Sequence, residues 1–132
     1  MSNSLNYRKL WLYLGYMMVA IVIYMSLHPN PPDTRAVFMG DKLLHVLTYI
    51  FFMIWFCQLY DSASYKYIGL YLFSLGVMIE IAQWGVGYRF FELADLVANF
   101  SGILIGWILA KIWFANLFKS IEDIILKKAV DP

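Results

Sequence analysis

The sequence predicts an all-α integral membrane protein that folds as one bundle of four transmembrane helices. Only 14% of its 132 residues are charged and 62% are hydrophobic, whereas roughly a quarter of a soluble domain is charged. The mean hydropathy is +0.66. Four apolar segments are each long enough to cross a hydrocarbon core of about 30 Å. A chain of this length suits a single compact domain.

The first predicted span is residues 10–27. Pro29 prevents the helix from continuing beyond it. A cleaved signal peptide is the competing interpretation, but the segment is long for one and no small-x-small cleavage site follows. We therefore expect a retained helix. The second predicted span, residues 43–60, follows Asp41, and a carboxylate in the first turn complements the helix dipole.

The third and fourth predicted spans, residues 67–86 and 93–118, form a hairpin around a short turn. The remaining tail, residues 119–132, carries Ile121, Ile124 and Ile125 together with Lys127 and Lys128, which suits a helix lying on the membrane surface. The single cysteine, Cys57, excludes a disulfide bond within the chain.

The basic residues predict the orientation of the bundle, because lysine and arginine favour the cytoplasmic side of a membrane. Four spans place both termini on one side. That side, or the adjacent end of a span, carries seven basic residues, Arg8, Lys9, Lys66, Lys111, Lys119, Lys127 and Lys128, against three elsewhere, Arg35, Lys42 and Arg89. We therefore expect both termini in the cytoplasm. The start of the second span, the end of the third and the start of the fourth then meet at the opposite face.

Polar side chains gather where these three span ends meet. Glu80 and Gln83 are three residues apart and share one face of the third span. One stripe of the fourth span carries Asp95, Asn99, Gly102 and Gly106. The second span begins with Asp41, Lys42 and His45. We expect these groups at one membrane level, forming a polar pocket that opens toward the outer leaflet.

This predicted pocket has the side chains that acid–base chemistry needs. A charge within the hydrocarbon costs at least ~2.5 kcal/mol, so intramembrane ionisable groups are candidates for function. The predicted catalytic residues are an imidazole and two carboxylic acids, His45, Glu80 and Asp95. The predicted ligand-binding residues are Asp41, Lys42, Gln83, Arg89 and Asn99. Lysine and arginine suit an anionic headgroup, so we expect binding or modification of a phosphate-bearing lipid.

Other interpretations of these polar residues are open. They could form a network that only holds the helices together in a non-enzymatic scaffold or accessory subunit. Proton-coupled transport would need polar groups that continue through the cytoplasmic half, where Lys111 is the one charge we identify in a span. His45, Glu80 and Asp95 could bind a divalent metal, but with one histidine in place we expect no metal and no other cofactor.

Membrane lipids are the expected partners. The net charge of +1, without a basic block, gives no indication of nucleic-acid binding. The spacing Gly102-x-x-x-Gly106 permits the close approach of another helix, either within the bundle or in a homo-oligomer.

Three motifs resemble the VanZ-like family in order and spacing. They are D-K-x-x-H from Asp41 to His45, E-x-x-Q from Glu80 to Gln83, and R-x-x-E-x-x-D-x-x-x-N-x-x-G from Arg89 to Gly102. The resemblance covers about residues 26–110. It implies a small integral protein of the bacterial inner membrane. The family's founding member is associated with low-level resistance to teicoplanin, a lipoglycopeptide that binds cell-wall precursors. No established reaction comes with the resemblance, and undecaprenyl-linked intermediates or phospholipids are the natural candidate ligands.

Overall fold

The computed structural model describes residues 5–29, 40–87 and 90–130, and the part of the chain that it describes is helical throughout, without a strand. The helices are α1 (Arg8–Leu27), α2 (Gly40–Cys57), α3 (Tyr65–Gly85), α4 (Leu93–Ile112) and α5 (Leu117–Val130). A single 3-10 turn, η1 (Ser62–Ser64), precedes α3. The predicted all-α fold class is confirmed.

Four of these helices, α1 to α4, are long and apolar enough to cross a membrane. α3 ends one residue earlier than predicted, and α2 and α4 end three or more residues earlier. α2 ends at Cys57 rather than at residue 60, because Gln58 and Leu59 close a tight turn by bonding to the carbonyl groups three residues back. α4 ends at Ile112 rather than at residue 118, and the amide groups of both Trp113 and Phe114 bond to the Leu109 carbonyl. The predicted fourth span therefore runs past the end of α4, through a turn, into the first two residues of α5.

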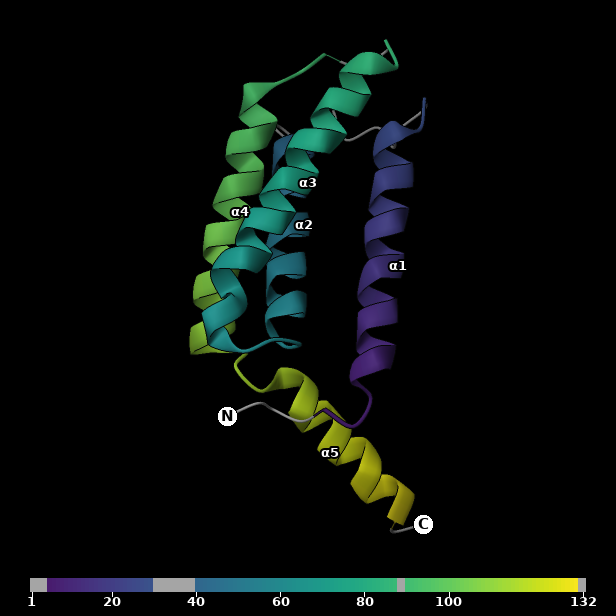
Figure 1. Ribbon diagram of the computed structural model, residues 1–132, viewed down its shortest axis with the longest axis vertical. Helices are drawn as coiled ribbons and strands as arrows, with labels where there is room; N and C mark the ends of the chain where they lie inside the picture. The colour runs from purple at the N-terminus through teal and green to yellow at the C-terminus, as the bar shows by residue number, and fades with distance from the viewer. Residues whose placement is uncertain (1–4, 30–39, 88–89, 131–132) are drawn as a thin grey trace.

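The helices α2, α3 and α4 form a tight group, and α1 stands beside it (Figure 1). α2 and α4 share the most extensive contact in the described chain. They run in the same direction, since α3 returns the chain between them. α5 crosses the end of the bundle at which the described chain begins, and the opposite end holds the C-terminus of α3 and the start of α4 (Figure 1).

Two glycines of α4 explain how closely α2 and α4 approach. A Cβ atom added at Gly102 would lie 2.5 Å from the carbonyl oxygen of Val46, and one added at Gly106 would lie 2.8 Å from that of Ile50. Only a residue without a side chain fits at these positions. The partner helix is thus α2 of the same chain. The alternative contact, a homo-oligomer through Gly102 and Gly106, stays a prediction, although both glycines are buried.

The tail forms a helix that is anchored by a buried carboxylate. Phe118 of α5 stacks on Trp11 of α1, with ring centroids 4.2 Å apart. Glu122, which is only 1% exposed, accepts hydrogen bonds from the Asn6 amide at 2.7 Å, the Tyr7 amide at 3.1 Å and the Trp11 indole at 2.8 Å.

Glu122 does for α1 what an N-terminal capping residue does within a helix. Tyr7 provides no side-chain cap, and the first turn of α1 has no acidic residue. The Glu122 carboxylate takes up unpaired amide groups at this end and complements the helix dipole. Glu122 lies in the predicted tail, where the sequence patterns gave no indication of a buried polar group.

A Gly102→Ala substitution tests the close approach of α2 and α4. The new methyl group would meet backbone, which cannot rotate aside, so the two helices must separate. We expect a loss of about 1–3 kcal/mol in stability, measured as thermal unfolding in one detergent. Gly85→Ala is the matched control, because nothing lies within 4 Å of its Cβ position. Equal melting temperatures for the two variants would contradict the proposed constraint.

Candidate functional site

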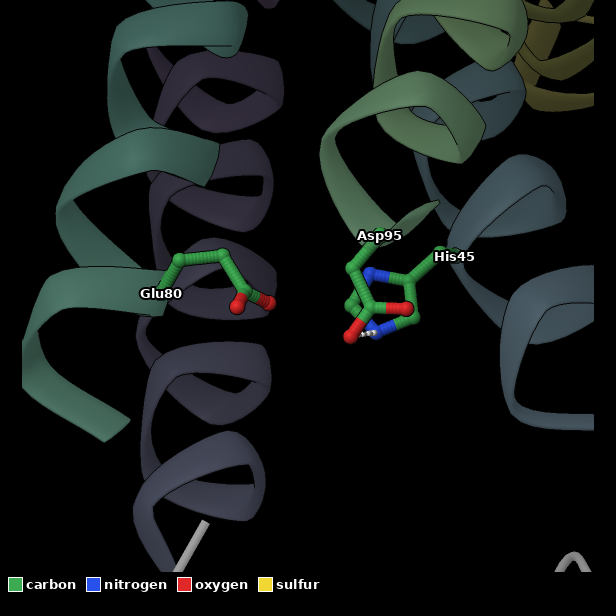
Figure 2. A group of neighbouring side chains, drawn as sticks. All are labelled: His45, Glu80 and Asp95. Atoms are coloured by element: carbon green, nitrogen blue, oxygen red, sulfur yellow. Dashed lines mark ion pairs between the residues drawn. The ribbon is translucent and has the colours of Figure 1, made fainter. Parts of the chain in front are cut away.

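Three helix ends bring the predicted catalytic residues together. His45 comes from the second turn of α2, Glu80 from near the end of α3, and Asp95 from the first turn of α4. One ligand atom from each lies within 4.8 Å of those of the other two. In Figure 2 the Glu80 carboxylate points across the gap between helices toward Asp95 and His45. Glu80 is 1% exposed and Asp95 is 4% exposed, so the cluster is largely shielded from the surface.

Lys42 is surrounded by three carboxylates. Its ammonium group lies 2.9 Å from Asp41 Oδ2 and 2.5 Å from Glu92 Oε2, and it forms an ion pair with Asp95 Oδ1. The Lys42 side chain is 17% exposed. Its charge is therefore already balanced within the protein. Among the residues predicted to bind an anionic ligand, Lys42 is the one that the structure shows fully engaged with acids.

A hydrogen bond to Asn99 indicates which ring nitrogen of His45 carries a proton. Its Nδ1 atom lies 2.9 Å from the side-chain oxygen of Asn99, which can only accept a hydrogen bond. Nδ1 therefore donates, and in the neutral ring Nε2 carries a lone pair. That atom faces Asp95 Oδ2 at 3.8 Å, too far for a hydrogen bond. Asn99, predicted to bind a ligand, thus orients the imidazole.

The two carboxyl oxygens of Glu80 differ in their hydrogen bonding. Its Oε2 atom accepts a hydrogen bond from the Glu92 amide at 3.2 Å. Glu92 is the residue just before α4 begins, so Glu80 caps that helix in the way an acidic residue of the same helix often does. Its Oε1 atom is buried and has no hydrogen-bond partner among the described residues. A buried oxygen without a partner costs free energy and calls for an explanation.

Gln83 and Arg89 differ from the other predicted ligand-binding residues. Gln83 donates a hydrogen bond to the Ser26 carbonyl at 2.9 Å, and this bond ties α3 to the last turn of α1. Its side chain is therefore used to fasten a helix. Arg89 lies outside the described residues.

The described cluster carries more acid than base. Four carboxylates, Asp41, Glu80, Glu92 and Asp95, stand against one ammonium group and one imidazole. Like charges this close disfavour one another in a low dielectric. The arrangement among the described residues therefore attracts a cation more readily than an anion.

An apolar groove lies beside the cluster, between α1 and α2. Its volume is about 380 Å³. The lining residues are Met18, Ile21 and Val22 of α1 and Leu47, Thr48, Phe51 and Phe52 of α2. Thr48 follows His45 by three residues, a rise of about 4.5 Å along the helix. The groove thus reaches to within one turn of the polar cluster, and the sequence patterns gave no indication of it.

These features define a multi-pass helical membrane protein with a buried, acid-rich cluster at one end of its bundle. The chain belongs to the VanZ/LLP1 family, whose model matches residues 7–114. The predicted family resemblance is confirmed. The matched region includes the whole cluster and ends before α5. Neither the curated proteins nor the solved structures contain a match to the chain.

Removing the Lys42 charge should destabilise the protein by leaving Asp95 buried without a counter-charge. We expect Lys42→Met to cost about 3 kcal/mol or more in unfolding free energy. Adding Asp95→Asn in the same chain should recover part of that loss. Glu92→Gln is the control, since the Glu92 side chain is 52% exposed and such pairs contribute about 1 kcal/mol or less. Additive losses in the double variant would show that the two residues do not depend on each other.

Proposed function

We propose that this protein binds an envelope lipid, with the lipid chain in the α1–α2 groove and the headgroup at the polar cluster. The observation that carries the proposal is the position of the groove, which ends one turn from His45. Ligand sites are typically concave and mostly apolar, with a few polar groups that fix orientation. An apolar groove beside a buried polar cluster fits an amphipathic molecule.

A headgroup at the cluster would meet a base and two carboxyl groups. His45 Nε2 has a lone pair because Nδ1 is held by Asn99. It is thus suited to accept a proton from a headgroup hydroxyl, with Asp95 beside it to stabilise the charged ring. Glu80 offers a second carboxyl group whose Oε1 atom has no partner among the described residues. These are the catalytic roles that we assign to His45, Glu80 and Asp95.

A phosphate on the headgroup would need a cation that is not already neutralised. Lys42 is held by three carboxylates, so we assign the phosphate to Arg89, the remaining basic residue of the motifs. Arginine can bind phosphate through two parallel hydrogen bonds. The resemblance stated above adds undecaprenyl-linked intermediates and phospholipids as candidates. Altered teicoplanin susceptibility is then the expected cellular effect.

We place the protein in the bacterial inner membrane with both termini in the cytoplasm. The excess of basic residues on that side supports this orientation. α5 adds to it, because Lys127 and Lys128 follow the exposed isoleucines Ile124 and Ile125 on a helix at the same end of the bundle as the start of α1. The polar cluster then faces the outer leaflet.

The second candidate is a non-enzymatic scaffold or accessory subunit. The Lys42 network favours it, since its ion pairs join α2 to Asp95 of α4 and to Glu92, the residue just before α4. In that case the cluster is an internal brace, and the partners of the protein carry the function.

The lipid proposal predicts that blocking the groove removes bound lipid. A Leu47→Trp variant puts a large ring into the groove lining. We expect the number of co-purified lipid molecules per protein chain, measured by native mass spectrometry, to fall severalfold. Leu104→Trp is the matched control, because Leu104 is similarly exposed but lies on α4, away from the groove. Equal lipid occupancy in both variants and wild type would contradict the proposal.

The stability of Glu80→Gln separates the lipid site from the brace. Glutamine keeps an acceptor for the Glu92 amide and removes a buried carboxyl group whose second oxygen has no partner among the described residues. We therefore expect the variant to be at least as stable as wild type, since residues held for function are often kept at a cost in stability. The measurement is thermal unfolding in metal-free detergent buffer. A melting temperature several degrees lower would favour the brace.

A further inference from the structure

We propose that His45, Glu80 and Asp95 bind one divalent metal cation of the kind that accepts mixed nitrogen and oxygen ligands, such as Zn²⁺ or Mn²⁺. The three residues come from three different helices, and their ligand atoms lie within 4.8 Å of one another. Both carboxylates are buried. A site of this kind would tie α2, α3 and α4 together at one point (Figure 2).

The imidazole is prepared for a metal. Histidines that bind metals almost always donate their other ring N–H to an oxygen, which fixes the ring and the tautomer. Here Asn99 accepts that hydrogen bond at 2.9 Å and is itself buried. The lone pair of Nε2 is thereby turned toward Asp95 Oδ2, so two electron-rich atoms face each other at 3.8 Å.

Glu80 supplies the independent observation. Its Oε1 atom is buried without a hydrogen-bond partner among the described residues, in a side chain that is 1% exposed. The carboxylate points toward His45 and Asp95 (Figure 2). An imidazole and two carboxyl groups that converge in a buried place need a proton or a cation between them.

A neighbouring acidic group shows what a cation does here. Asp41, Glu92 and Asp95 also lie close together, and the Lys42 ammonium group sits among them. Asp95 belongs to both groups. Its Oδ1 atom pairs with Lys42, whereas its Oδ2 atom faces His45. The group of Asp41, Glu92 and Asp95 has Lys42 as its cation. The group of His45, Glu80 and Asp95 has the side chains to bind a metal cation from solution.

The distance between His45 and Asp95 suits a small cation. Ligands at about 2.1 Å from a tetrahedral Zn²⁺ are about 3.4 Å apart, so the 3.8 Å between His45 Nε2 and Asp95 Oδ2 needs to contract only slightly. Three protein ligands leave a coordination position for water or a substrate. This inference replaces the expectation of no metal, which was based on the single histidine of the cluster.

The metal site does not depend on the lipid proposal, because all three ligands belong to the chain. When the cation is bound, His45 Nε2 is a metal ligand and no longer a proton acceptor, and the cation then offers a positive charge to an anionic headgroup.

The test uses the whole chain, purified without a polyhistidine tag and stripped with EDTA. Mn²⁺ is added, and free Mn²⁺ is followed by its EPR signal. We expect wild type to bind one equivalent and Zn²⁺ to displace it. His45→Ala and Glu80→Gln should each weaken binding at least ~tenfold. Asp123→Asn removes an exposed carboxylate of α5 and should change nothing. No saturable binding by wild type, or wild-type affinity in both site variants, would overturn the proposal.

A second measurement needs no site variant and so does not depend on how the variants fold. Pulsed EPR of Mn²⁺-loaded wild type should show the ¹⁴N coupling of an imidazole ligand. His28 is the only other histidine, and His28→Asn should keep the coupling. A Mn²⁺ signal without nitrogen coupling in wild type would exclude His45 as a ligand and overturn the site.

Discussion

The close contact between α2 and α4 is the constraint on which the polar site depends. Gly102 and Gly106 let the backbone of α2 lie directly against α4. Because the two helices run in the same direction, their first turns lie at the same level of the bundle. Lys42 therefore meets Asp95, and His45 meets Asn99 one turn further along. α3 then brings Glu80 to the same place from its opposite end. Apolar packing in the middle of the bundle thus sets the geometry of the charges at its end.

Buried glutamates have a second role in this fold. Glu80 accepts from the backbone at the start of α4, and Glu122 does the same at the start of α1. In both cases the carboxylate comes from a different helix. A carboxylate that receives amide hydrogen bonds at the positive end of a helix dipole loses less on burial than an isolated charge. The two differ in one respect, because both oxygens of Glu122 are bonded and one oxygen of Glu80 is not.

The sequence was sufficient for the fold class and for placing His45, Glu80 and Asp95 close together, because long apolar runs and helical spacing are local signals. It did not predict that Gln83 bonds to α1 instead. His45, Glu80 and Asp95 were brought together by topology alone. The end of α4 was predicted wrongly, since the turn after Ile112 is built from apolar residues such as Trp113 and Phe114, and hydropathy does not distinguish them from a span. Glu122 was missed because it lies in a polar tail, and its burial depends on how α5 meets α1. The ion pairs of Lys42 and the groove between α1 and α2 likewise depend on the tertiary structure.

The way α1 is attached has a consequence for how a ligand would arrive. Among the described residues, the hydrogen bonds from α1 to other helices lie at its two ends. At one end Gln83 bonds to Ser26, and at the other Glu122 and Trp55 bond to Trp11. The groove lies between these two sets of hydrogen bonds. A lipid bound there, as we propose, would lie between the two attached ends of α1. It would enter from the side without leaving the hydrocarbon, so its exchange would be governed by diffusion in the plane of the membrane.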